Sequence, residues 1–96
     1  MKTKVLKVSF TGIMEIAGEK TDEEKVNEVK RILNDWDSVV NIGAVSGCKV
    51  FYDGFKYVHE NSIDEAMEFV LTFLLQFNGD AYVTGVEILH EHCFDN

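Results

Sequence analysis

The densest group of potential metal ligands is His90-Glu91-His92-Cys93, near the end of the sequence. Two histidines at positions i and i+2 of a strand project to the same side, about 7 Å apart, so both could reach one metal ion. A tetrahedral site needs further ligands, which only distant residues such as His59 or Cys48 could supply. The favoured interpretation is therefore a polar strand end that binds no metal, and a metal site at His90 and His92 is a minor alternative.

A second candidate for chemistry is Cys48, because a neighbouring ammonium such as that of Lys49 favours the reactive thiolate. Neighbouring residues of a strand point to opposite faces, however, and no histidine can be assigned as a general base. The run from Gly43 to Lys49 has three residues between its glycines and leads into a predicted strand, so it is a β-turn and not a phosphate-binding loop. We predict a protein without catalytic residues or cofactors.

The charge of the chain is unevenly distributed along the sequence. Residues 1–56 hold all nine Lys and Arg and nine of the 17 Asp and Glu, whereas residues 57–96 hold eight acidic residues and no Lys or Arg. Such an acidic segment repels nucleic-acid phosphates and attracts a basic protein surface. A basic protein partner is therefore the leading hypothesis, against the plain alternative that the net charge of −8 only maintains solubility.

The leading hypothesis is a small inhibitor or immunity-type protein that covers the nucleic-acid-binding surface of a nuclease or a phage-targeted defence effector. It is based on charge and size alone. The predicted contacts with the partner are Glu60, Asp64, Glu65, Glu68, Glu87 and Glu91. This hypothesis requires that lysines from the first half of the chain do not lie among these carboxylates in the folded protein.

Composition predicts one α+β domain spanning residues 1–96, because 46% hydrophobic residues can form a core at this length. The sequence has no run of eighteen apolar residues, which excludes a membrane-spanning helix. Lys2, Lys4 and Lys7 alternate with apolar residues in the manner of a strand and do not precede an apolar block, so we expect a cytoplasmic protein. In that compartment Cys48 and Cys93 are expected to be reduced and half-buried.

The first half of the chain reads as a strand, a helix and a meander. Residues 4–17 alternate apolar and polar residues in phase across Gly12, which favours one long strand over a hairpin. Thr21 with Glu24 is a capping box for a helix that runs to about Asn34. Residues 38–58 predict three strands, the last two joined by a hairpin turn at Asp53-Gly54. Aromatic residues on both faces of this meander suggest that one face packs on the helices and the other is exposed or meets a partner.

The second half contains the most apolar segment of the chain. Residues 62–79 predict a helix with a capping box at Ser62 and Glu65 and a glycine end at Gly79. Its apolar stripe is wider than that of an ordinary surface helix, so we expect it to be largely covered. Residues 81–94 predict a last long strand, and Gly85 in it marks a bulge or a close approach of the backbone.

The predicted order is therefore β-α-β-β-β-α-β, with two helices packed on one face of a largely antiparallel sheet. The long first and last strands are expected to be central neighbours. The wide apolar helix and the aromatic residues on both sheet faces leave a second functional alternative, a homodimeric structural or scaffold domain whose apolar surface is covered by a second copy.

Overall fold

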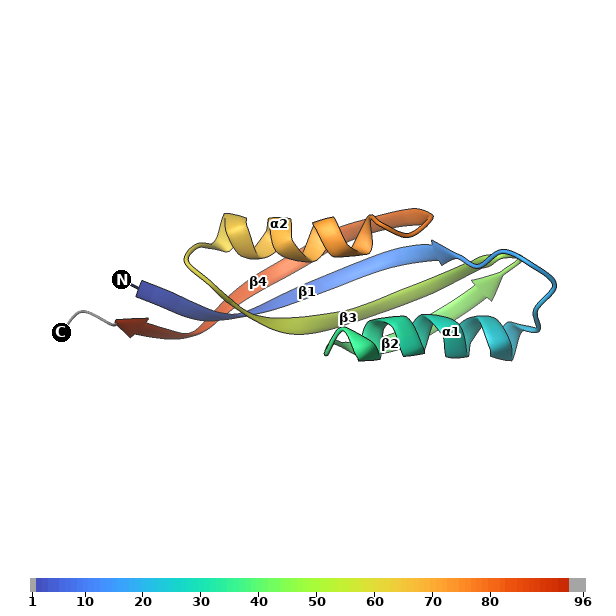
Figure 1. Ribbon diagram of the computed structural model, residues 1–96, viewed down its shortest axis with the longest axis horizontal. Coiled ribbons are helices and arrows are strands. Elements are labelled where there is room, and N and C mark those ends of the chain that lie inside the picture. The colour runs from blue at the N-terminus through green and yellow to red at the C-terminus, as the bar shows by residue number, and fades with distance from the viewer. Residues whose placement is uncertain (1, 94–96) are drawn as a thin grey trace.

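The computed structural model describes the backbone of residues 2–93 and the side chains of residues 4–89. In this range the chain forms a four-stranded antiparallel sheet with two helices, and the strands lie in the order β2-β3-β1-β4 (Figure 1). The predicted α+β class is confirmed. The elements are β1 (Lys2–Glu15), α1 (Asp22–Asp35), β2 (Val39–Ser46), β3 (Lys49–Glu60), α2 (Ile63–Leu74) and β4 (Gly79–Cys93).

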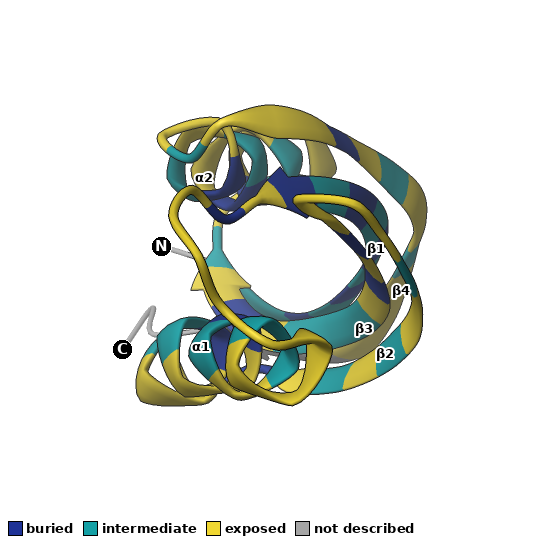
Figure 2. Ribbon diagram, turned by 90° about the vertical axis from the view of Figure 1, so that its right-hand side faces the viewer, coloured by how far each residue is buried: buried dark blue, intermediate teal, exposed yellow. Residues whose placement is uncertain are grey.

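Both helices lie on the same, concave face of a strongly curved sheet, as predicted (Figure 2). Leu6, Val8 and Phe10 alternate along β1 and are at most 1% exposed, because β1 is an inner strand whose apolar side faces the helices. The helices contribute further buried side chains to the same core, namely Val29, Leu33, Ala66, Val70 and Leu74. The sheet therefore holds α1 and α2 on the same face, where both contribute to one core.

The predicted hairpin turn at Asp53-Gly54 is wrong, because β3 runs through this pair without a break. In β3, Asp53 lies between Thr11 of β1 and Asn41 of β2. A Cβ atom at position 54 would lie 2.1 Å from the carbonyl oxygen of Val39, so the glycine allows β2 to approach closely. The last two predicted strands of the meander are thus one strand, and with that correction the predicted element order fits the structure.

The second helix is shorter than predicted. α2 ends at Leu74, and Gly79 starts β4 instead of ending the helix. Gly79 does have a positive φ of 131°, but its role is close approach, since a Cβ there would lie 1.8 Å from the carbonyl oxygen of Ile13. The backbone N–H of Glu15 donates to the carbonyl of Asn78, which attaches this turn to β1. Pairing with β1 therefore decides where the helix ends.

The last strand pairs with β1, as predicted, but it is a sheet edge and not a central strand. Its register shifts twice, between Ser9 and Phe10 and between Val5 and Leu6 of β1. The first shift leaves Thr84, next to Gly85, without a partner in β1, in agreement with the predicted bulge. Each bulge reverses the alternation of side chains, so Tyr82, in register with Thr11, and Ile88, in register with Leu6, lie on opposite faces although six residues separate them.

Candidate functional site

A hollow of about 450 Å³ lies between α2 and the C-terminal end of α1, on the helical side of the molecule. Trp36 lines it from the end of α1, and the other lining residues belong to α2 and the turn after it: Glu65, Glu68, Phe69, Thr72, Phe73 and Gln76. Its volume is in the usual range of ligand pockets. We call it the aromatic hollow, because three of its seven lining residues carry aromatic rings.

The floor of the aromatic hollow is a set of nearly parallel rings. The ring of Phe73 stacks on Trp36 with centroids 4.0 Å apart and planes 10° apart, and Phe69 lies 6.3 Å from Trp36 at 25°. Lys56 reaches Trp36 from β3: its ammonium lies 4.9 Å from the ring centroid and donates a hydrogen bond to the Trp36 carbonyl. Phe69 remains 46% exposed, so its ring is the open part of the floor.

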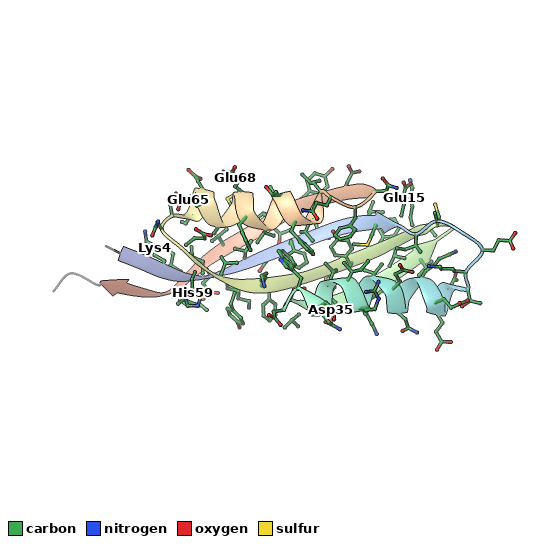
Figure 3. The ribbon with its side chains drawn as sticks, viewed as in Figure 1. Lys4, Glu15, Asp35, His59, Glu65 and Glu68 are labelled. Atoms are coloured by element: carbon green, nitrogen blue, oxygen red, sulfur yellow. The ribbon has the colours of Figure 1, made fainter. Side chains whose placement is uncertain are left out.

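The rim of the aromatic hollow is a polar row on α2 and the turn after it, formed by Glu65, Glu68, Thr72 and Gln76. The spacings of three and four residues place these side chains on one side of the helix. Both carboxylates are exposed on α2, which Figure 3 shows above the labelled Asp35 at the end of α1. Among the described side chains, no ion pair joins either carboxylate to a Lys, Arg or His. The rim is therefore negative over an apolar floor.

The carboxylate of Glu65 is available because the predicted capping box of α2 closes only halfway. The Ser62 hydroxyl accepts a hydrogen bond from the backbone N–H of Glu65, but the return bond from the Glu65 side chain is not formed. In α1 both bonds form: Thr21 accepts from the Glu24 N–H, and the Glu24 carboxylate accepts from the Thr21 N–H at 3.0 Å. The hydrogen bond from the Thr21 backbone N–H to the carboxylate is the largest cause of the lowered pKa of Glu24.

A second hollow, of about 460 Å³, shares Gln76 with the first and lies where the β1–α1 loop meets the end of α2. It contains Lys20 and Glu28, which form an ion pair with each other. The hydrogen bond from Lys20 is the main reason why the pKa of Glu28 is lowered. Two of the three charged residues that line this hollow, Lys20 and Glu28 but not Glu15, are therefore paired with each other, in contrast to the two carboxylates of the aromatic hollow.

The six predicted contact residues divide into two groups in the structure. Asp64, Glu65 and Glu68 are exposed on α2, and two of them line the aromatic hollow. Glu60, Glu87 and Glu91 lie in the sheet, where β1 runs between β3 and β4 and brings its lysines beside them. Lys4 is in register with both Glu60 and Glu91, and Lys7 is in register with Glu87.

The expectation of a continuous, uncompensated acidic surface is therefore wrong for the sheet. The lysines of β1 precede the acidic segment by more than fifty positions, so only strand pairing brings the two together. Lys4 also donates a hydrogen bond to the carbonyl of Asn61, just before α2. Of the six predicted contacts, those without a lysine in register are thus Asp64, Glu65 and Glu68 on α2, and the last two border the aromatic hollow.

Comparison of the chain with known proteins gives no relative from which a function could be inferred. No family model, curated protein or solved structure matches the chain. No fold or activity can therefore be transferred from a relative, and the functional argument depends on the site itself.

The other predicted chemistry is limited by what the structure describes. Among the described residues, no three His, Cys, Asp or Glu residues lie close enough together to hold a metal ion. The side chains of His90 and His92 fall outside the described residues, so that metal site stays a prediction. Cys48 is exposed and free, not half-buried, and lies in the turn between β2 and β3. No helix within the described chain is long and apolar enough to cross a membrane.

Three aromatic residues of the hollow were absent from the predicted contacts: Trp36, Phe69 and Phe73. Phe69 and Phe73 belong to the wide apolar stripe of the predicted helix, and the expectation that this helix is largely covered treated them as core. That expectation is wrong, since Phe69 and Leu75 are 46% and 55% exposed. A useful signal was present in the sequence, because Glu65, Phe69 and Phe73 follow one another at helical i, i+4 spacing.

Proposed function

We propose that this chain is a small acidic, non-enzymatic binding protein whose aromatic hollow receives a basic segment of a partner protein. The observation that carries the proposal is the combination of an apolar, aromatic floor with two rim carboxylates that have no ion-pair partner among the described residues. Apolar contact supplies affinity in such a site, and the carboxylates select a positively charged partner and speed its association.

The partner class that fits this chemistry is a protein with a basic, nucleic-acid-binding surface, as in a nuclease or a defence effector. The proposed role is to cover that surface as an inhibitor or immunity-type protein does. We expect Asp64, Glu65 and Glu68 to contact the partner. The other three predicted contacts have lysines of β1 in register and should contribute less to binding: Glu60, Glu87 and Glu91.

Trp36 is the single tryptophan of the chain and lines the aromatic hollow, so its fluorescence reports directly on occupancy. The test is a titration at low salt with a synthetic basic peptide that contains both arginine and lysine. We expect a saturable change in Trp36 fluorescence that weakens as salt rises, because screening reduces attraction between exposed charges. The triple variant Asp64→Lys, Glu65→Lys and Glu68→Lys should lose at least about tenfold in affinity, or about 1.4 kcal/mol.

A matched control reverses three exposed carboxylates elsewhere: Glu19→Lys, Glu23→Lys and Asp53→Lys. This variant has the same net charge as the first but leaves the rim of the aromatic hollow intact. If both triple variants lose affinity equally, the protein attracts the peptide by net charge alone and the hollow is not the binding site. If the unmodified protein does not change the fluorescence of Trp36 at any peptide concentration, the proposal is wrong.

A second candidate function is favoured by a separate observation at the edge of the sheet. β4 is an edge strand, and Tyr82, Ile88 and Leu89 on it are 62%, 45% and 46% exposed. Ile63 at the start of α2 and Leu75 just after its end are also exposed, at 40% and 55%. An uncovered edge with apolar side chains is a site for strand pairing with another chain, and a second copy would make the homodimeric scaffold that the sequence suggested.

Analytical ultracentrifugation tests this second function. A homodimer predicts a mass near twice 10.9 kDa at micromolar concentration that falls to the monomer value in the variant Ile88→Lys. A mass that stays at the monomer value at every concentration would exclude the scaffold function and leave the binding function unaffected.

A further inference from the structure

We infer that the aromatic hollow selects an arginine side chain of its partner over a lysine side chain; this inference rests on the proposed function. The two cations carry the same charge but differ in shape and hydration. The guanidinium of arginine is planar, weakly hydrated and carries five N–H donors in a fixed arrangement, whereas the lysine ammonium is a compact and strongly hydrated point charge. Three features of the hollow match the guanidinium.

The first feature is the arrangement of the rings. The ring planes of Phe73 and Phe69 lie 10° and 25° from the plane of Trp36, so the floor is already a stack of flat groups. The exposed ring of Phe69 is the open end of this stack. A planar cation can extend such a stack by lying flat on Phe69 and gains both π-stacking and cation–π attraction there. An ammonium gains the cation–π attraction alone.

The second feature is the number and position of acceptors. Glu65, Glu68, Thr72 and Gln76 form the rim and carry two carboxylates, a hydroxyl and an amide oxygen. Glu65, Glu68 and Thr72 lie within about one helical turn of Phe69, so their acceptors are the ones nearest to a group lying on its ring. A guanidinium can donate to several of these acceptors at once, and a carboxylate can take two parallel bonds from it. The three donors of an ammonium can satisfy fewer of them.

The third feature is the charge below the floor. Lys56 holds its ammonium 4.9 Å from the centroid of Trp36 and is bonded to the Trp36 carbonyl, so the position nearest the sheet is already occupied by a cation. A second cation is repelled from that position and is held at the outer end, near Phe69 and the two carboxylates. Because the floor there is apolar, the strongly hydrated ammonium loses more hydration than the guanidinium does.

The experiment uses four short peptides of neutral Gly, Ser and Ala residues that differ at one central position: arginine, lysine, citrulline or dimethylarginine. Binding to the full chain is followed by Trp36 fluorescence and by NMR shifts of α2 residues. We expect the arginine peptide to bind at least about fivefold more tightly than the lysine peptide, and citrulline not to bind because it lacks the charge. Dimethylarginine keeps the charge but blocks part of the hydrogen-bonding fork, so its affinity should be intermediate.

Two variants separate the contributions of stacking and charge. Phe69→Leu keeps an apolar side chain but removes the ring, so it should reduce the preference for arginine over lysine while both peptides still bind. Glu65→Gln with Glu68→Gln should weaken both peptides, and the arginine peptide more, because only the guanidinium can give one carboxylate two parallel bonds. Glu19→Gln with Glu23→Gln removes two exposed charges elsewhere and should leave the arginine peptide within about twofold of its original affinity.

The outcomes distinguish a failure of arginine selection from a failure of the proposed function. Equal binding of the arginine and lysine peptides, with loss in the Glu65→Gln/Glu68→Gln variant, would overturn arginine selection and support the proposed function. Tight binding of citrulline would overturn selection by charge. No response of Trp36 or α2 to any of the four peptides, together with none to the longer basic peptide, would overturn the proposed function and this inference together.

Discussion

The two helices begin in the same way but use their charged residues differently. Each starts after a hydroxyl N-cap, Thr21 in α1 and Ser62 in α2, and each carries acidic residues in its first turn. In α1 several of these and later charges are bound within the protein: Glu24 closes its capping box, and Lys20, Lys25 and Arg31 pair with Asp22, Glu28 and Asp35 of the helix. In α2, Glu65 leaves its box open, and the described part of the chain shows no ion pair on the helix.

This difference separates a structural helix from one available for recognition. A carboxylate that already accepts hydrogen bonds or faces a lysine has less to gain from a partner, because its existing contacts must first be given up. Exposed ion pairs contribute little to stability, so α2 loses little by lacking them. What α2 gains is a free negative rim beside the exposed ring of Phe69.

The largest expected effect tests whether the two helices share one cooperative core. Leu33 of α1 and Leu74 of α2 are 0% and 3% exposed, and each packs in the same buried cluster. Leu33→Ala and Leu74→Ala should each lower the free energy of unfolding by about 2–5 kcal/mol, as measured by urea denaturation. A much smaller loss for Leu74→Ala would mean that α2 opens independently of α1, and the comparison of the helices would then concern two separate units.

The next effect concerns the N-caps. Replacing Thr21 or Ser62 with alanine removes the hydrogen bond to the backbone N–H three residues later, which is worth about 1 kcal/mol at a helix start. Because Thr21 also belongs to a closed capping box, we expect Thr21→Ala to lower the melting temperature more than Ser62→Ala. Equal losses in differential scanning calorimetry would contradict the different closure of the two boxes.

A smaller effect is expected from the second bond of each capping box, in which the glutamate side chain accepts from the backbone N–H of the N-cap residue. Glu24→Ala removes the side-chain acceptor of the Thr21 N–H, whereas Glu65→Ala removes a carboxylate that makes no such bond. Both substitutions delete one negative charge from the first turn of a helix, so the dipole contribution changes equally. We expect a lower melting temperature for Glu24→Ala than for Glu65→Ala. In binding the order should reverse, with only Glu65→Ala weakening capture of the basic peptide.

The smallest expected effect is a pH dependence that belongs to α1. Glu24 and Glu28 have folded-state pKa values below the ordinary value of 4.5, because Thr21 and Lys20 stabilise their charged forms. A lowered folded pKa contributes stability that is present above the unfolded value and is lost as pH falls through the folded value. Melting temperatures measured downward from pH 5 should therefore fall less steeply in Glu24→Gln/Glu28→Gln than in the original protein. An unchanged slope would show that these contacts do not persist in solution.

Local sequence determined the elements whose signals lie within one segment. The α+β class, the long first strand through Gly12 and the closed capping box at Thr21 and Glu24 all follow from periodicity or short-range spacing, and the structure agrees with them. Val29 and Leu33 of α1 are both buried, as their spacing of four residues on a helix requires. These features need no knowledge of distant residues.

Tertiary structure decided the features that depend on which segments lie side by side. Pairing of β3 with β1 and β2 kept Asp53-Gly54 in a strand although its local chemistry favours a turn, and pairing of β4 with β1 ended α2 before Gly79. The same pairing placed Lys4 and Lys7 in register with the carboxylates of the sheet. The number of charges in the acidic segment follows from the sequence alone. Which carboxylates lie near a lysine depends on strand order and helix packing, because the interaction of two charges depends on their distance in space. The fold places Glu65 and Glu68 of α2 beside the open aromatic surface.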